Sequence, residues 1–244
     1  MKKENLELSV IIPSYNEEKF IKKTVLDLDE YLIEQNVDHE IIVINDGSTD
    51  ATQKLLDELK IVKPNLIILK NKINTGKGYS IKRGIFESKG KFVLFFDADL
   101  TFHVHNIGKL YNQCKNGLDI VIGSRVMKGT EITEKIPRQR LLLSSTFLFF
   151  TRLLVIGDFL DTQCGIKCFR GEVARELFKK QSINRFAFDV EILYLANKKN
   201  CRIIEVPVSL SHYSEGSVNI IKDSMNMFGS LFLIRINDLL GKYK

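Results

Sequence analysis

A regular alternation of short apolar runs with segments of helical periodicity limits the folds that this chain can adopt. Between the runs, apolar residues recur at helical spacing, as they do from Phe20 to Ile33, and we expect further helices at 51–60 and 77–88. Short apolar runs are typical of strands buried on both faces of a sheet. We expect such strands at 8–13, 40–45, 66–69, 91–96 and 120–122. This order predicts an α/β fold with a mostly parallel, doubly wound sheet and right-handed crossovers.

The length and composition favour one continuous domain. The chain has 244 residues, 44% of them hydrophobic, and shows no internal repeat, low-complexity tract or Pro/Gly linker. We expect one domain over 1–244, with a nucleotide-binding half at about 6–122 and an acceptor half at about 123–219. Residues 220–244 are expected to form a C-terminal amphipathic helix.

Several classes of protein are disfavoured by charge and composition. No run reaches about 18 consecutive apolar residues, and the charged start lacks the apolar core of a signal peptide, so neither a bilayer span nor secretion is expected. The four cysteines form no paired C-x-x-C knuckles, which favours reduced structural thiols in a cytosolic protein over a zinc site. A net charge of +6 favours an anionic partner but does not identify it.

Polar clusters follow directly on three of the expected strands. They lie at Pro13–Glu17, Asp46–Ser48 and Asp97–Asp99. Ligands of doubly wound sheets bind beyond the carboxyl ends of the strands. We therefore expect the three clusters to converge on one edge of the sheet.

The strongest local signal for chemistry is the pair Asp97 and Asp99. Two carboxylates next to a buried strand need a cation nearby, and Mg²⁺ or Mn²⁺ holding a diphosphate would supply it. Because alternate residues of a strand point to opposite faces, both can reach one ion only if the chain turns there or water bridges one of them. The alternative is a solvated loop without a metal.

A glycine-rich segment, Asn74 to Gly78, opens the third expected helix. Its backbone N–H groups and Lys77 could approach phosphate oxygens. It lacks the Walker pattern, and the first strand does not lead into G-x-G-x-x-G, so a dinucleotide-binding dehydrogenase has little support.

Taken together, these motifs resemble the inverting family 2 glycosyltransferases, which have a GT-A fold. The resemblance is carried, in order, by Ser9 to Glu18, Val43 to Asp50, Asn74 to Gly78 and Asp97 to Asp99. It implies that Asp46 meets the nucleotide base and that Asp97 and Asp99 face the metal and the diphosphate. It also implies donor binding by Pro13, Tyr15, Asn16, Glu17, Gly76 and Lys77.

The second half is similar to dolichyl-phosphate glucosyltransferases and, less closely, to dolichyl-phosphate mannose synthases. The segments concerned are Ile122–Arg125, Asp161–Lys167 and Phe186–Glu191. The resemblance implies inverting transfer of a hexose, glucose from UDP-glucose being favoured, to a polyprenyl phosphate. GDP-mannose as donor stays an alternative. It also implies a peripheral protein on the cytoplasmic face of a membrane.

The role of the acidic residues depends on the acceptor. A phosphate monoester is largely dianionic at neutral pH and needs positioning more than deprotonation, whereas a sugar hydroxyl on a glycan or protein would need a general base. Asp161, Asp189 and Glu191 are the candidates, and we place Asp161, Asp189 and Asp99 among the catalytic residues. Asp189 and Glu191 could equally be structural acids that begin a helix.

Basic and apolar segments complete the acceptor half. Arg125, Arg138 and Arg140 could clamp phosphate, Arg125 also on the donor side, or be surface charges. The apolar runs 141–156 and 220–239 fit either interfacial helices against a membrane or buried helices of the fold or of a homodimer.

Two other interpretations have less support. A nucleotide-binding module without catalysis is disfavoured by the complete motif series, and a nucleic-acid binder by the lack of any such motif. His39 is expected in a turn, and none of the four histidines has metal-ligand spacing.

Overall fold

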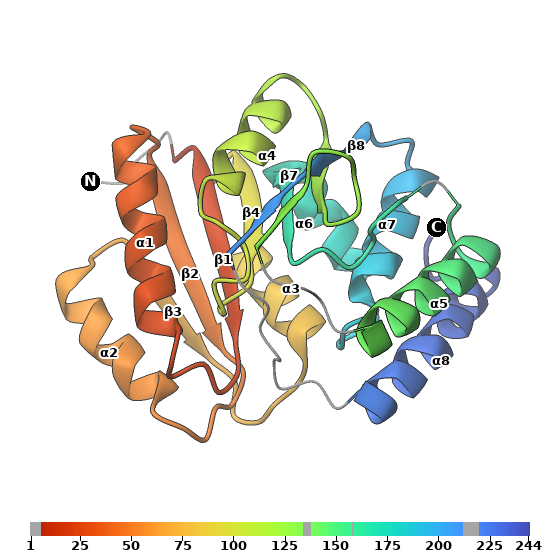
Figure 1. Ribbon diagram of the computed structural model, residues 1–244, viewed down its shortest axis with the longest axis horizontal. Coiled ribbons are helices and arrows are strands. Elements are labelled where there is room, and N and C mark those ends of the chain that lie inside the picture. The colour runs from red at the N-terminus through yellow and green to blue at the C-terminus, as the bar shows by residue number, and fades with distance from the viewer. Residues whose placement is uncertain (1–5, 134–137, 158, 212–219) are drawn as a thin grey trace.

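The computed structural model describes residues 6–133, 138–157, 159–211 and 220–244, and the side chains of 138–141 and 220–222 are also outside the description. Its centre is a seven-stranded sheet with the order β3-β2-β1-β4-β7-β5-β8 (Figure 1). The strands are β1 (Leu8–Ser14), β2 (His39–Asn45), β3 (Leu66–Lys70), β4 (Phe92–Phe96), β5 (Ile120–Ser124), β7 (Ile166–Arg170) and β8 (Ile203–Pro207). A small second sheet pairs β6 (Glu131–Ile132) with β9 (Ser209–Leu210).

Helices cover both faces of the sheet. They are α1 (Ile21–Glu34), α2 (Thr52–Val62), α3 (Lys77–Glu87), α4 (Asn106–Lys115), α5 (Arg138–Leu154), α6 (Gly171–Lys180), α7 (Phe188–Lys198) and α8 (Ile220–Leu239). Buried residues of α1, α2 and α4 form one core with one face of the strands. Those of α3, α6, α7, α5 and α8 form a second core with the opposite face. The expected α/β sheet flanked by helices is confirmed.

The direction of β7 is what the alternation of strands and helices did not predict. β7 runs antiparallel between β4 and β5, whereas β1 pairs in parallel with both β2 and β4. Because β7 is reversed, its first residue lies beside the last residue of β4, with Phe96 opposite Ile166. The residues that precede β7 are thereby brought next to those that follow β4.

The expectation of a turn at His39 is wrong. His39 begins β2, is buried, and its ring nitrogens lie 2.9 Å from Asp29 Oδ1 and from the carbonyl of Val37. Asp29 also accepts hydrogen bonds from Lys63 and Asn65. A polar strand start can be buried here because tertiary partners satisfy its hydrogen bonds.

Helices α5 and α8 pack against each other at one end of the molecule (Figure 1). Phe147 of α5 packs edge-on against Phe228 of α8, with ring centroids 5.7 Å apart. Both helices expose apolar side chains on their outer sides, among them Leu142, Phe149, Leu153, Phe232, Leu233, Ile236 and Leu239. Within the described ranges, no helix is long and apolar enough to cross a membrane.

Candidate functional site

The three polar clusters lie at the carboxyl ends of β2, β1 and β4, which are neighbours in the sheet, so the predicted convergence is confirmed.

The loops after β1 and β2 are joined by hydrogen bonds of Asn16. Its backbone N–H donates to Ser48 Oγ at 2.9 Å, and its Oδ1 accepts from the Thr49 N–H at 2.8 Å. Asn16 has a φ of 56°, a conformation that asparagine tolerates better than most residues. Pro13, Tyr15 and Glu17 lie half-buried beside it.

Asp46 is almost fully buried and holds the glycine-rich segment in place. Its Oδ1 accepts from Asn71 Nδ2 at 2.6 Å and from the Thr75 N–H at 2.9 Å, and its Oδ2 accepts from the Gly76 N–H at 2.8 Å. Gly76 has a φ of 107°, and a Cβ there would lie 2.5 Å from the carbonyl oxygen of Asn184. A glycine is therefore required where this segment enters α3.

The chain turns directly after β4, which is the condition for Asp97 and Asp99 to share one ion. Ala98 and Asp99 form the turn, and Leu100 has a φ of 55°. Asp99 Oδ1 accepts from the Thr101 N–H at 3.0 Å. Asp97 Oδ1 lies 2.5 Å from Lys77 Nζ, so the lysine of the glycine-rich segment reaches the aspartate pair.

Gly165, immediately before β7, is packed against Asp97. A Cβ at Gly165 would lie 1.8 Å from Asp97 Oδ2. Only a glycine leaves room for the carboxylate in this position. Sequence reasoning did not single out Gly165, because the contact depends on the reversed strand that it precedes.

Arg125 and Asp161 form a bidentate pair at the end of β5. Asp161 Oδ2 accepts from the backbone N–H of Arg125 at 3.0 Å and from its Nε at 2.7 Å, and Asp161 Oδ1 accepts from its Nη2 at 2.8 Å. Although burial acts to raise it, the pKa of Asp161 is lowered by Arg125. Asp161 is thus an ionised carboxylate with both oxygens engaged, which suits it to orient Arg125 rather than to accept a proton.

Lys167 and Asp189 form a second buried pair. Lys167 Nζ donates to Asp189 Oδ1 at 2.5 Å and to the carbonyl oxygen of Cys164 at 2.8 Å. Burial raises the pKa of Asp189, while Lys167 and Lys77 oppose the rise. The sequence offered one indication of this pair, a lysine inside the apolar run 166–169. A buried ammonium requires an acidic partner, so Lys167 could have predicted a buried ion pair.

The electrostatics connect these groups into one cluster. Desolvation by burial, with the charges of Asp99 and Asp97, raises the pKa of Glu17 to about 7. Burial likewise raises the pKa of Asp97, and Asp99 adds to this while Lys77 and Lys167 oppose it. Among the described residues, the cluster contains five carboxylates and three basic groups, namely Glu17, Asp97, Asp99, Asp161 and Asp189 with Lys77, Arg125 and Lys167. If all are ionised, two negative charges are uncompensated.

Two uncompensated negative charges match the charge of one divalent cation. In the part of the chain that the structure describes, no three His, Cys, Asp or Glu side chains gather as a metal cage. Within residues 6–133, 138–157, 159–211 and 220–244, the chain would therefore supply no more than two such side-chain ligands to one ion, and water and substrate oxygens are common further ligands of Mg²⁺ at phosphate sites. Asp99 is the better candidate ligand, since Asp97 is already paired with Lys77.

Glu191 is a structural residue. It is fully buried, accepts from the backbone N–H of Ile183 at 2.9 Å and from Ser182 Oγ at 2.6 Å, and is bonded by the Tyr243 hydroxyl. Because these donors occupy both of its oxygens, the interpretation as a catalytic base has no geometric support. The alternative of a satisfied acid near the start of a helix agrees with the structure.

We expect Glu191→Ala to lower the free energy of unfolding by about 3 kcal/mol, because several buried donors would lose their acceptor. Urea unfolding monitored by circular dichroism would measure this. Glu172→Ala, on the exposed side of α6, is the control and should change stability little. Unchanged stability with abolished turnover would instead indicate a chemical role for Glu191.

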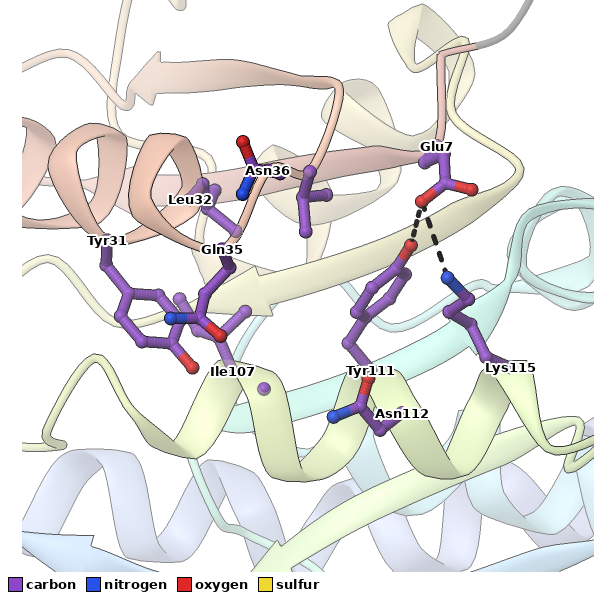
Figure 2. Close-up of a pocket in the computed structure, with 11 residues that line it drawn as sticks. Glu7, Tyr31, Leu32, Gln35, Asn36, Ile107, Tyr111, Asn112 and Lys115 are labelled. Carbon is purple, nitrogen blue, oxygen red and sulfur yellow. Dashed lines mark hydrogen bonds and ion pairs between the residues drawn. The ribbon is translucent and has the colours of Figure 1, made fainter.

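A pocket of about 140 Å³ between α1 and α4 is lined by Tyr31, Gln35, Asn112 and Lys115 (Figure 2). Glu7, which directly precedes β1, bonds the Tyr111 hydroxyl at this pocket. The pocket therefore lies at the amino-terminal side of β1, away from the carboxylate cluster. It is smaller than typical ligand sites, which are roughly 300 Å³ or more. It is not a candidate for the active site.

Comparison with known families gives one clear match. Residues 9–178 match the model of the family described as "Glycosyl transferase family 2". This segment includes every residue assigned to the donor side, together with the Arg125–Asp161 pair.

Relatives of known description match nearly the whole chain. The dolichyl-phosphate beta-glucosyltransferase of Dictyostelium discoideum is 37% identical over 99% of this chain and 77% of its own length. The enzyme of the same name from Saccharomyces cerevisiae is 32% identical over 99% of this chain and 78% of its own.

A crystal structure of glucosyl-3-phosphoglycerate synthase from Mycobacterium tuberculosis, in complex with Mn²⁺, UDP and phosphoglyceric acid, is similar in fold. Its TM-score is 0.68 at 18% identity, with 97% of this chain and 78% of that chain covered. At this identity the likeness concerns the fold alone, and it agrees with the expected GT-A architecture.

Proposed function

This chain belongs to glycosyl transferase family 2, and we propose that it transfers glucose from UDP-glucose to a polyprenyl phosphate such as dolichyl phosphate, with inversion. The observation that carries the proposal is the similarity to dolichyl-phosphate beta-glucosyltransferases at 30–37% identity, which extends over nearly the full chain in most of these relatives. The carboxylate cluster with its three basic groups supports this chemistry, because the donor carries an anionic diphosphate.

We assign the donor to the edge formed by β2, β1 and β4. Pro13, Tyr15, Asn16 and Glu17 would border the nucleoside. The oxygens of Asp46 are already hydrogen-bonded, so Asp46 would act on the nucleotide base indirectly, by fixing the glycine-rich segment beside it. Gly76 would let the backbone approach the diphosphate, and Lys77, now paired with Asp97, would donate to its oxygens.

We assign a divalent cation, Mg²⁺ or Mn²⁺, to Asp99 with Asp97 beside it. When bound, the metal would neutralise charge that develops on the leaving diphosphate. The excess of two negative charges that the cluster carries when all its groups are ionised supports this assignment. The charges of Asp99 and Asp97, which add to burial in raising the pKa of Glu17, support it as well.

We assign the acceptor phosphate to Arg125. Two of the N–H groups of its guanidinium are used by Asp161, and a planar guanidinium has five, so donors remain for an anionic ligand. The acceptor phosphate would attack the anomeric carbon from the face opposite the leaving UDP, so the bond to the diphosphate breaks as the new bond to the acceptor oxygen forms. The engaged state of Asp161 agrees with an acceptor that needs no general base. The side chains of Arg138 and Arg140, the other candidate clamps, lie outside the described residues.

A transfer assay tests the reaction. The protein is incubated with radiolabelled UDP-glucose, UDP-galactose or GDP-mannose and with dolichyl phosphate in detergent, with Mg²⁺, Mn²⁺ or EDTA. We expect label in the lipid phase from UDP-glucose alone, and none with EDTA. Label from GDP-mannose would replace the donor assignment, and transfer only to sugar hydroxyls would replace the acceptor assignment.

We further propose that α5 and α8 place the protein on a membrane, as a peripheral protein on the cytoplasmic face. Their exposed apolar side chains, with Phe149 and Phe232 exposed by 62% and 58%, form a larger apolar surface than single scattered residues would. Arg235, Lys242 and Lys244 are exposed at the same end of the chain and could meet anionic head groups.

We expect the double variant Phe149→Glu and Phe232→Glu to co-sediment with vesicles of phosphatidylcholine and phosphatidylserine at least about fivefold less than the wild type, because two large apolar anchors are lost. Ile61→Glu, at an even more exposed apolar position on α2, should have no effect. If the wild type is a dimer and the double variant a monomer, with vesicle binding equal in both, the surface is instead a homodimer interface.

A further inference from the structure

The segment that presents Asp161 is held from two sides. Glu205 of β8 accepts the backbone N–H groups of two successive residues, Leu160 at its Oε2 and Asp161 at its Oε1, both at 2.8 Å. On the other side, Arg152 of α5 donates to the carbonyl oxygen of Phe159 from Nε at 3.0 Å and from Nη2 at 2.8 Å. Four hydrogen bonds to charged groups thus fix the backbone of residues 159–161.

The carboxylate of Asp161 takes no part in these four bonds, and it accepts hydrogen bonds from Arg125 instead. Glu205 is opposite Ile122 in the pairing of β5 with β8, and Arg125 directly follows the last residue of β5. The backbone of β5 and the backbone of 159–161 therefore share one rigid support. The carboxylate of Asp161 binds both the backbone N–H and the guanidinium of Arg125. A guanidinium held by a fixed carboxylate in this way loses little freedom when it binds a ligand.

We infer that Glu205 and Arg152 are positioning residues for the acceptor phosphate, acting through the backbone of 159–161 and through Asp161 on Arg125. Neither residue is assigned a contact with the acceptor. Arg152 lies on α5, one of the two helices assigned to the membrane surface, so the helix that would meet the lipid is hydrogen-bonded to the segment that orients the phosphate ligand. The inference rests on the proposed function, because it takes Arg125 as the phosphate-binding residue.

A double-mutant cycle separates positioning from a merely structural role. The probe is farnesyl phosphate, a short polyprenyl phosphate, and its Kd is measured by titration calorimetry together with that of UDP. We expect Glu205→Gln to weaken farnesyl phosphate binding about tenfold, since a charged acceptor of two N–H groups becomes a neutral amide. The Kd for UDP should stay within about twofold. In an Arg125→Gln background, Glu205→Gln should cause no further weakening.

Arg152→Gln is carried through the same cycle with the same expectation, so that a misfolded Glu205 variant leaves the test intact. Glu172→Gln, at an exposed position with an ion pair to Arg170, is the matched control and should change neither Kd. Equal weakening in both Arg125 backgrounds, or an equal loss of UDP affinity, would overturn the inference while the proposed function stands. If the wild type binds UDP but not farnesyl phosphate, the acceptor assignment falls, and the inference with it.

Discussion

Asp99→Asn is expected to lower the rate of glucose transfer by about 10³-fold, because an amide would replace the only carboxylate of the aspartate pair that has no ion-pair partner among the described residues. The substitution is nearly isosteric. The amide oxygen of the new side chain could keep the hydrogen bond from the Thr101 N–H, so the turn should persist. The loss would therefore come from charge and metal affinity, and the Kd for Mn²⁺ in the presence of UDP should rise in parallel.

Asp57→Asn on the exposed side of α2 is the matched control for this substitution. It removes the same charge far from the cluster, where the Asp57 side chain accepts a hydrogen bond from Gln53. Turnover and Mn²⁺ affinity should both equal those of the wild type. A variant Asp99→Asn that binds Mn²⁺ and UDP normally and still turns over would show that the metal is held elsewhere.

Gly165→Ala is expected to lower kcat/KM by about 100-fold. The new Cβ would lie 1.8 Å from Asp97 Oδ2, and Asp97 cannot swing away without breaking its 2.5 Å ion pair with Lys77. Displacements of about 1 Å at a reacting centre cost on the order of 10²-fold in rate. Steady-state kinetics with UDP-glucose and dolichyl phosphate would measure the effect.

Gly157→Ala is the control for this second substitution, since a Cβ at Gly157 meets no described atom within 4 Å. It should stay within about twofold of the wild type. Equal activity of Gly165→Ala and the wild type would mean that Asp97 occupies another position during turnover.

The convergence of the three polar clusters on one edge of the sheet could largely be predicted from local sequence. Each polar cluster follows its own strand within a few residues, and in a parallel sheet the carboxyl ends of neighbouring strands must meet at one edge. The strands themselves were recognisable because a short apolar run is typical of a strand that is buried on both faces of a sheet. The roles assigned to Pro13, Tyr15 and Asp99 stay predictions until they are tested.

The contacts of Asp161, Glu191 and Glu205 were harder to predict, because these residues find their partners through tertiary contacts. Asp161 was expected near the reacting centre, as a base if the acceptor were a hydroxyl, but its pairing with Arg125 joins residues 36 positions apart. Glu191 was left open between base and structural acid until Ser182, Ile183 and Tyr243 were seen around it. Nothing in the local sequence predicted the contacts of Glu205, since a single acidic residue in a half-buried strand is common.

Local periodicity and motifs in a fixed order were enough to predict the alternation of strands and helices, the edge at which the polar clusters meet, and the family. The reversed direction of β7 is seen only in the folded chain, as are the contacts of Gly165 with Asp97 and of Lys167 with Asp189 that depend on it. The physical reason is that strand direction and the partner of a buried charge are set by packing and desolvation across the whole chain, and no local pattern of residues encodes them.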